Sequence, residues 1–266
     1  MPVNVVVCVK QVPHPEHLNR ISLDAGTGRI NREGVPAVIN PGDRHALEEA
    51  LRIRERLSGT VTVLTMGPSQ SRKALEEALA MGPDAAVHLC DPAFGGADTL
   101  ATARALACAI GKLAPFSLVL CGDATVDSGT GQVPVQIAEF LHLPCVTEVT
   151  EIAFEDEQSL LVKRDWEGGW AKIRCRLPAV IAVTAKINQP RLPTVMDIIA
   201  ATGKEIKNWT AADIGADASG VGLCGSPTRF FEICEFHARR QGDVLKGTAE
   251  ETVTRAIARL VDMEAL

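Results

Sequence analysis

The chain has 266 residues, of which 46% are apolar and 23% are charged. This balance is ordinary for a soluble globular protein with one sizeable core, alone or with a smaller module. The formal net charge of −6 argues against a nucleic-acid partner, because such proteins present a basic face. No apolar run approaches the roughly 20 residues of a membrane span, and residues 1–10 lack the features of a signal peptide. We therefore expect a cytoplasmic protein without a membrane span.

Strands and helices alternate through the first half of the chain. Apolar runs predict strands at 3–10, 60–66, 85–90 and 117–121, and helical spacing predicts helices from about 40, at 69–81, at 99–113 and at 135–141. Asn40 and Asp43 are candidates to cap the first helix. Such alternation implies right-handed crossovers. The predicted fold class is α/β, a Rossmann-like parallel sheet flanked by helices.

The pattern changes near Cys145. Four strand-like runs at 146–154, 159–166, 170–176 and 179–184 either extend the sheet with antiparallel strands or form a small sheet beside it. A loop with two prolines and an exposed-looking segment, 194–203, follow. Residues 208–239 show little periodicity, so we expect an arm that lies on a partner.

The C-terminal residues predict one more helix. Thr248-Ala-Glu-Glu251 is a capping box, and the helix after it carries an apolar stripe of Val253, Ile257, Leu260 and Val261. We therefore divide the chain into an α/β domain, 1–207, and a C-terminal arm and helix, 208–266, that packs on a partner subunit.

The eight cysteines predict neither a zinc site nor a redox pair. No two are separated by only two residues, and none lies at metal-ligand spacing from a histidine. We expect reduced, buried thiols, and His88 as a core residue with satisfied polar atoms. No catalytic triad or P-loop is present, so the sequence predicts no catalytic side chain.

Residues 122–134, Gly-Asp-Ala-Thr-Val-Asp-Ser-Gly-Thr-Gly-Gln-Val-Pro, are the most informative stretch. They join a predicted strand to a predicted helix, and backbone N–H groups at a helix N-terminus form a seat for phosphate or pyrophosphate. Gly129 and Gly131 keep bulky side chains away from that seat. Segments 8–13 and 66–68 would lie at the same carboxyl edge of the sheet, where such folds bind ligands. The chain is therefore expected to bind a nucleotide.

Five motifs in order resemble the beta subunit of electron transfer flavoprotein. They are Val7-Cys-Val-Lys-Gln-Val-Pro13, Asn40-Pro-Gly-Asp43 before Ala46-Leu-Glu-Glu-Ala50, Met66-Gly-Pro68 with Ala78-Leu-Ala-Met-Gly82, the 127–134 loop, and Leu177-Pro-Ala179 with Asn188-Gln-Pro-Arg191. The resemblance runs from residue 1 to about 207. It implies a heterodimer in which the alpha subunit carries the electron-transferring FAD. The beta subunit then has an adenine-nucleotide-binding Rossmann-like fold and holds a second nucleotide.

The family has two types, which differ in this second nucleotide. The resemblance implies structural AMP in the respiratory type. In the bifurcating type it implies FAD, reduced by NADH, with one electron passing to ferredoxin or flavodoxin and the other to an acyl-CoA or related dehydrogenase. The run Asp91–Thr102 resembles the bifurcating and FixA-like members, and Gly95 and Gly96 would let a flat ring approach the backbone. We therefore expect FAD with NADH as donor, although Asp123 departs from the basic or neutral residue of many members.

The candidate nucleotide contacts come from the loop and from the resemblance. They are Cys8, Val9, Lys10, Asn40, Asp43, Met66, Phe94, Asp98, Thr99, Gly122, Asp123, Ala124, Thr125, Asp127, Ser128, Gly129, Thr130, Gly131, Gln132, Val133 and Pro134. Asp127 either orients a ribose hydroxyl or holds the loop, and Asn40 caps its helix with or without an adenosine contact. Lys10 and Gln132 either contact phosphate or simply face solvent. Cys8 and Met66 either contact adenine or fill the core.

Residues 190–201 resemble the family's recognition loop, which docks the dehydrogenase. The resemblance makes Arg191, Val195 and Ile198 candidate docking residues, with Val195 in the place of the apolar anchor; an ordinary surface loop is the alternative. Two other functions remain open. One is a non-bifurcating beta subunit with structural AMP, and the other is a stand-alone adenine-nucleotide-binding module.

Overall fold

The computed structural model describes residues 2–20, 22–24, 29–31, 34–228, 242 and 244–263. The chain forms two compact units, Met1–Phe230 and Phe231–Leu266. The division that we predicted after residue 207 therefore lies too early. Residues 208–228 belong to the first unit for reasons given below.

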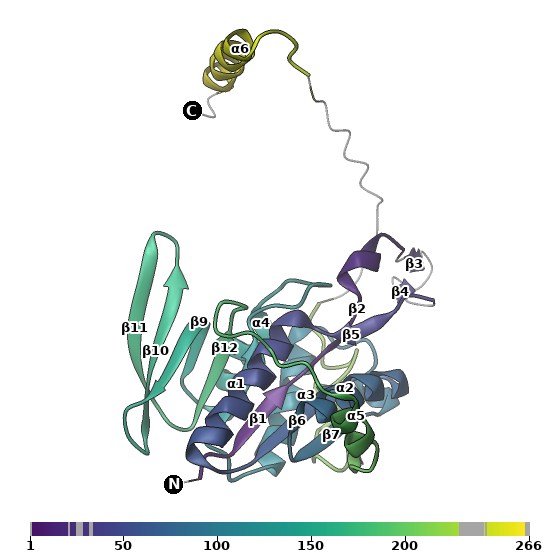
Figure 1. Ribbon diagram of the computed structural model, residues 1–266. Helices are drawn as coiled ribbons and strands as arrows, with labels where there is room; N and C mark the ends of the chain where they lie inside the picture. The colour runs from purple at the N-terminus through teal and green to yellow at the C-terminus, as the bar shows by residue number, and fades with distance from the viewer. Residues whose placement is uncertain are drawn as a thin grey trace. The chain divides into compact units, whose positions relative to one another are not determined.

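A nine-stranded sheet forms the centre of the first unit, in the order β11-β10-β9-β12-β8-β1-β6-β7-β13 (Figure 1). Its strands are β1 (Val5–Cys8), β6 (Val61–Met66), β7 (Ala85–Leu89), β8 (Leu118–Gly122), β9 (Cys145–Phe154), β10 (Ser159–Trp166), β11 (Gly169–Arg176), β12 (Ala179–Val183) and β13 (Ile206–Trp209). Along the sheet from β9 through β12, β8, β1, β6 and β7 to β13, neighbouring strands are parallel. At the other end of the sheet, β10 is antiparallel to both β9 and β11. The second half of the chain thus extends the first sheet, which was one of our two predicted arrangements.

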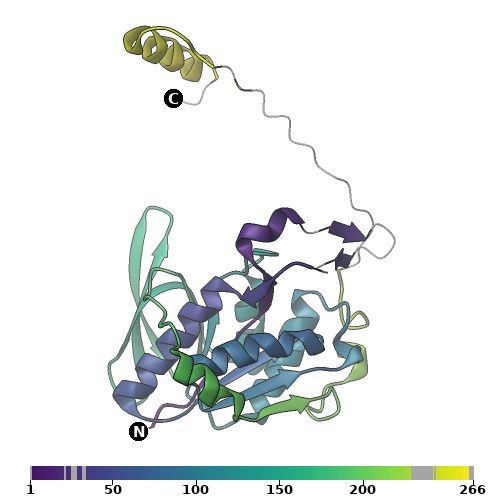
Figure 2. The same cartoon turned by 45° about the vertical axis from the view of Figure 1, so that its right-hand side comes forward.

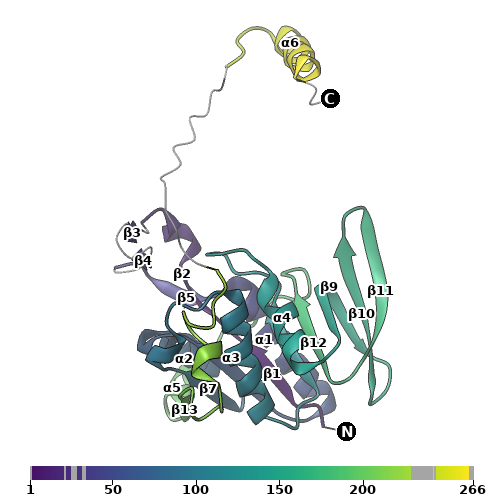
Figure 3. The same ribbon diagram turned by 180° about the vertical axis from the view of Figure 1, so that it is seen from behind.

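Helices cover both faces of the sheet, as Figures 2 and 3 show from two sides. Successive strand side chains point to opposite faces. Val5 and Val7 of β1 therefore pack with α1 (Pro41–Leu57) and α2 (Arg72–Met81), while Val6 and Cys8 pack with α3 (Thr99–Lys112) and α4 (Gln132–Leu141). Burial on both faces explains the continuous apolar runs of the sequence. The predicted α/β class is confirmed.

Several short elements lie outside these layers. Two antiparallel pairs are formed by β2 (Gln11–Pro13) with β5 (Ala37–Ile39) and by β3 (Ser22–Asp24) with β4 (Arg29–Asn31). The 3-10 turns are η1 (Pro15–Arg20), η2 (Ser69–Ser71), η3 (Pro92–Phe94) and η4 (Ala218–Gly220). Elements this short have no periodicity that a sequence pattern could reveal.

The segment 194–203, expected to be merely exposed, contains the helix α5 (Val195–Thr202). Its start is fixed by a capping box, in which the Thr194 hydroxyl accepts from the Asp197 N–H and the Asp197 carboxylate accepts from the Thr194 N–H. Such a box satisfies donors that a helix start leaves open. The same signal, Thr194-Val-Met-Asp197, is present in the sequence directly after the loop with two prolines.

Residues 208–228 do not form the arm that we predicted. β13 pairs with β7 at the edge of the sheet, and Ile214 and Val221 are buried in the α3–α4 side of the core. The Asp, Ser and Gly residues that hide periodicity here build turns, in which the carboxylates of Asp213 and Asp217 accept backbone N–H groups. The remainder of the predicted arm, 229–239, lies outside the described residues.

The second unit contains α6 (Ala249–Asp262). The predicted capping box is present, because the side chain of Thr248 accepts the Glu251 N–H and the Glu251 side chain accepts the Thr248 N–H. The predicted apolar stripe is exposed on this helix: Val253, Ile257, Leu260 and Val261. Across the described residues, no helix combines the length and apolar content needed to cross a bilayer.

The cysteines largely follow the prediction of unpaired thiols. The seven described ones are free, and Cys8, Cys121 and Cys175 are buried. Cys224 is exposed, which differs from the expectation, and Cys234 lies outside the described residues. His88 is buried in β7 with its Nε2 3.1 Å from the Gly67 carbonyl oxygen, as expected, and burial lowers its pKa.

Candidate functional site

The carboxyl ends of β1 and β8 meet where the strand order reverses. β1 pairs with β6 on one side and with β8 on the other, and the chain leaves these two strands towards helices on opposite faces of the sheet. In open α/β sheets, the crevice at such a point receives the ligand. The segments that follow β1 and β8, 9–13 and 123–134, lie at this point of the sheet edge, which we call the crevice.

The loop after β8 has the strand–loop–helix arrangement that the sequence predicts. Gly129 and Gly131 have φ angles of +59° and +61°, a region that glycine enters without strain. A Cβ atom at either position would meet no atom closer than 3.5 Å, so conformation rather than crowding requires these glycines. α4 starts after Gly131 without a side-chain cap. Because Pro134 has no N–H, the donors that this helix start offers to an anion are the N–H groups of Gln132 and Val133.

The other loop residues have different surroundings. The hydroxyl groups of Thr125 and Ser128 lie 2.8 Å apart. Ala124 and Thr130 are exposed, while Val133 packs against the core and Pro134 is buried in the first turn of α4. The loop thus presents hydroxyl groups and small residues at its surface and anchors itself by its last two residues.

Lys10 reaches across the crevice from the end of β1. Its Nζ lies 2.8 Å from Oδ1 of Asp127 and 3.4 Å from the Ser128 hydroxyl. The Asp127 side chain is 4% exposed, and that of Lys10 is 40% exposed. Lys10 is therefore more than a surface lysine, because its ammonium group is held beside the glycine loop. Asp127 holds that lysine, a contact that differs from the two roles we left open for it, a ribose contact and bracing of the loop.

Asn40 and Asp43 do not cap α1 with their side chains, contrary to our prediction. The buried Asn40 amide donates to the Ala124 carbonyl at 3.0 Å and accepts the Val126 N–H at 3.1 Å. The Asp43 carboxylate accepts the Lys10 N–H at 2.8 Å and the Gly122 N–H at 3.1 Å. Both side chains therefore hold the two borders of the crevice together.

Burial raises the pKa of Asp43 to about 6, and hydrogen bonds from Asn40 and from the backbone of Lys10 and Gly122 offset only part of this rise. The nearby Lys10 charge also lowers this pKa, but desolvation of the buried carboxylate is the larger effect. Gly122 permits the close approach, since a Cβ there would lie 2.5 Å from Oδ1 of Asp43.

The contacts of Asp123 explain how the loop tolerates this carboxylate. Its Oδ1 accepts the N–H of Glu148 at 3.1 Å, so the group is directed to β9. Glu148 has a φ of +56° and lies at a register shift of β9. Burial raises the Glu148 pKa, and the neighbouring Asp123 adds to the rise. Glu148 was absent from our predicted residues, because a bulge depends on strand pairing rather than on local pattern.

The residues of the turn 91–99 that we predicted to contact the nucleotide make contacts within the chain instead. Phe94 is a buried core residue. The Asp98 carboxylate caps α3 through the Ala101 N–H at 3.0 Å and also accepts the Thr228 N–H at 3.0 Å. The side chain of Leu223 covers Gly96, where an added Cβ would meet it at 3.2 Å. The predicted open backbone at Gly95 and Gly96 is therefore wrong, because the chain's own segment 221–226 lies there.

Thr99 links the starts of α3 and α4. Its hydroxyl donates to Oε1 of Gln132 at 2.8 Å, and Nε2 of Gln136 lies 3.5 Å from the same hydroxyl. Oε1 of Gln136 is buried without a hydrogen-bond partner. Sequence reasoning missed Gln136, although it lies one helical turn after Gln132. An unpaired buried oxygen is costly and calls for a donor.

The residues predicted for adenine lie in or against the core. Cys8 and Val9 are buried, and Met66 packs against the α3–α4 side of the core. Both backbone groups of Val9 are used, since its N–H donates to Leu64 and its carbonyl accepts from the Thr65 hydroxyl. Core packing is therefore the role that the structure gives these residues. Among the residues described, no group of His, Cys, Asp or Glu side chains could hold a metal ion.

The predicted docking residues separate into two kinds. Val195 and Ile198 are exposed on α5. The Arg191 guanidinium instead points at α1, where it pairs with Glu48 and Glu55 at 2.7 and 2.6 Å. Glu48 and Glu49, which with Arg52 anchor this segment, were missing from our prediction because their partners lie far away in sequence.

The fold and the crevice define the class of protein first. It is an α/β protein of the doubly wound kind, with a glycine-rich loop at a helix start of the type that accepts nucleotide phosphates.

Comparison with known proteins gives the family. The model of the electron transfer flavoprotein domain matches residues 27–214. The chain is 43% identical over 258 residues to the electron transfer flavoprotein subunit beta of Thermoanaerobacterium thermosaccharolyticum, covering 97% of each chain. It is 41% identical to the caffeyl-CoA reductase-Etf complex subunit CarD of Acetobacterium woodii, covering 95% of each. It is 39% identical to protein FixA of Bradyrhizobium diazoefficiens, covering 92% of this chain and 87% of FixA. The chain belongs to the electron transfer flavoprotein family, among its beta subunits.

Proposed function

We propose that this beta subunit holds FAD in the crevice between β1 and β8 and works in a heterodimer with an alpha subunit that carries a second FAD. NADH is the electron donor, and the products are one electron for ferredoxin or flavodoxin and one for an acyl-CoA or related dehydrogenase. The setting is the cytoplasm. Family membership supports the electron-transfer role, and the crevice supports the nucleotide.

The glycine loop carries this proposal. Three features converge on it: the uncapped start of α4, the left-handed glycines 129 and 131, and the Lys10 ammonium group held by Asp127. Backbone donors and one cation suit a pyrophosphate. Residues 129–132 would hold the phosphates, with Lys10 balancing their charge. Asn40 and Asp43 would keep the loop in place without touching the ligand.

The start of α3 favours a dinucleotide over a mononucleotide. The Thr99 hydroxyl and the Gln132 amide form an exposed pair beyond the glycine loop. A ligand longer than a mononucleotide would find further hydrogen-bonding groups there. When bound, FAD supplies the capacity to accept a hydride and release single electrons, which no side chain here has. The protein supplies binding, orientation and charge.

Structural AMP is a second candidate, and one observation favours it. Leu223 and the segment around it cover Gly95 and Gly96, the backbone at which we had expected a flat ring. AMP needs no room beyond the loop. With AMP, the subunit would shape the heterodimer and dock dehydrogenases without redox chemistry of its own.

Counting nucleotides tests the proposal. The chain is co-expressed with its alpha subunit, the complex is extracted with acid, and FAD and AMP are quantified per heterodimer. We expect two FAD and no AMP. One FAD with one AMP supports the second candidate, and one FAD with no other adenylate contradicts nucleotide binding by this subunit.

A matched pair of glycine variants locates the site. Gly131 and Gly215 have nearly equal φ angles, +61° and +64°, so Gly→Ala strains both equally. Gly131→Ala should lower the content of one nucleotide, while Gly215→Ala should retain both. Equal nucleotide content in the two variants would contradict the location.

The partners follow from the family and from α5. The name of the CarD relative describes a complex with a reductase. Exposed apolar side chains on α5 suit docking to such a dehydrogenase. Pull-down of the heterodimer with an acyl-CoA dehydrogenase from the same organism tests this part, and absence of binding would contradict it.

A further inference from the structure

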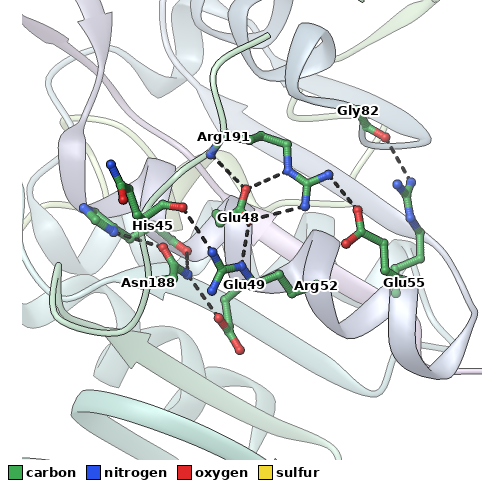
Figure 4. Close-up of polar contacts among 10 residues, drawn as sticks. His45, Glu48, Glu49, Arg52, Glu55, Gly82, Asn188 and Arg191 are labelled. Atoms are coloured by element: carbon green, nitrogen blue, oxygen red, sulfur yellow. Dashed lines mark hydrogen bonds and ion pairs between the residues drawn. The ribbon is translucent and has the colours of Figure 1, made fainter.

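The middle of α1 holds the segment 188–191 through a network of hydrogen bonds and ion pairs (Figure 4). The Asn188 amide donates to the His45 carbonyl and to Glu49, both at 3.0 Å. Arg191 donates to Glu48 from its backbone at 3.1 Å and from Nε at 2.7 Å. The network therefore fixes both ends of a four-residue segment on one helix.

Charge makes the Arg191 contact specific. The Glu48 side chain is 4% exposed, and its carboxylate receives Arg191 at both oxygens and Arg52 at 2.7 Å. Burial alone would raise the pKa of Glu48, but the two guanidinium groups lower it below its usual value. The Arg191 side chain also donates to Glu55, so it binds two carboxylates, those of Glu48 and Glu55. A planar guanidinium that binds two oxygens has a defined orientation.

The anchored segment leads directly into α5. Only Leu192 and Pro193 separate Arg191 from Thr194, the N-cap of α5. At the C-terminal end of α5, Ala201 is buried in the core, so the helix is held at both ends. Between these points Val195, Met196, Ile198 and Ile199 are exposed. Their positions in space therefore depend on where Arg191 is held.

We propose that Glu48 and Arg191 are positioning residues for docking: they fix the start of α5 so that its apolar side chains meet the dehydrogenase, and Arg191 does not itself contact that partner. This proposal rests on the docking role proposed above for α5. It replaces our prediction that Arg191 is a contact residue.

The first test needs no partner. Amide hydrogen exchange is compared among the wild-type heterodimer, Glu48→Gln, Arg191→Lys and the double variant. Exchange should become about fivefold faster or more at 192–199 and stay unchanged at 118–134. The control pair is Arg174→Lys and Glu155→Gln, which changes an exposed Arg–Glu contact between β11 and the residue after β9 and should leave exchange at 192–199 unchanged. Unchanged exchange in Glu48→Gln and Arg191→Lys would overturn the proposal.

The second test measures docking to an acyl-CoA dehydrogenase purified from the same organism, by surface plasmon resonance. Glu48→Gln and Arg191→Lys should each weaken binding about five- to tenfold, and the double variant no more than the weaker single variant, because both break one contact. Direct contact by Arg191 predicts instead that Glu48→Gln binds normally, and that result overturns the proposal.

Val195→Asp separates this proposal from the docking function itself. It places a charge on α5 without touching the Glu48 network. If Val195→Asp weakens docking and Glu48→Gln does not, only the positioning proposal fails. If Val195→Asp binds as tightly as wild type, α5 is not the docking element, and the docking role fails together with the positioning role.

Discussion

Asp43 and Glu48 lie little more than one turn apart on α1, and both are buried, yet their pKa values shift in opposite directions. Asp43 holds the glycine loop through backbone N–H groups, and burial raises its pKa to about 6. Glu48 holds the segment 188–191 through guanidinium groups, which outweigh burial. At Glu48 the two guanidinium partners outweigh the desolvation cost, whereas at Asp43 the hydrogen bonds offset only part of it.

The comparison shows how one helix serves two surfaces by different means. At its first turn, close backbone approach at Gly42 and Gly122 and a buried acid fix the crevice. In its middle, ion pairs fix the path towards α5. Changes at the first turn should therefore act through packing and desolvation, and changes in the middle through charge.

Gly122→Ala should have the largest effect. The added Cβ would lie 2.6 Å from the Gly42 carbonyl carbon and 2.7 Å from the Asp43 nitrogen, neither of which can move without shifting α1. We expect a loss of about 3 kcal/mol in the free energy of unfolding, measured by urea denaturation, and loss of one nucleotide. Gly111→Ala is the control, because no atom lies within 4 Å of its Cβ. Equal stability of the two variants would contradict the close approach.

Asp43→Asn should show a distinctive dependence on pH. The folded pKa of about 6 exceeds the usual aspartate pKa of 3.8, so the native state binds more protons between these values and wild-type stability falls as pH rises through them. Asparagine lacks this titration. The stability difference should move in favour of the variant by up to about 3 kcal/mol between pH 4 and pH 7. A difference independent of pH, measured by urea denaturation, would contradict the raised pKa.

Two asparagines give a smaller contrast. Asn40→Ala leaves the Ala124 carbonyl and the Val126 N–H without their partner in a buried setting, and we expect a loss of about 2 kcal/mol. Asn188→Ala breaks bonds in a half-buried setting, which should cost about 1 kcal/mol. Thermal unfolding of both variants checks the order. A reversed order would show that the Asn40 bonds at the crevice stabilise the fold less than the Asn188 bonds at the segment 188–191.

Glu48→Gln should give the smallest change and the opposite pH trend. The folded pKa lies below the usual glutamate pKa of 4.5, so the stabilisation by Glu48 is present above that pH and is lost as pH falls through the lowered pKa. The variant should therefore be less stable than wild type at pH 7 and approach it in acid. A gap that widens in acid would contradict the ion-pair account, and urea denaturation at several pH values measures it.

The sequence predicts the elements that its local patterns specify. Continuous apolar runs indicate the parallel strands, and small residues between strand and helix indicate the loop 122–134, which the structure confirms as a strand–loop–helix unit. These features depend on residues close together in the chain.

The partners of the site residues depend instead on tertiary contacts. Asn40 forms hydrogen bonds with Ala124 and Val126, which lie more than 80 positions away in the sequence. The local sequence does not reveal these partners and indicates only a helix cap. Phe94 was predicted to contact the ligand, but tertiary packing buries it in the core. Residues 208–228 lack periodicity because turns, rather than disorder, use their polar side chains.

The central claim is that the loop braced by α1 holds the nucleotide. Amide exchange of the heterodimer, stripped of this nucleotide and then supplied with FAD, tests it most directly. The account predicts new protection at 123–133, with residues 188–203 unchanged. Protection confined to other segments, or none at all, would contradict it.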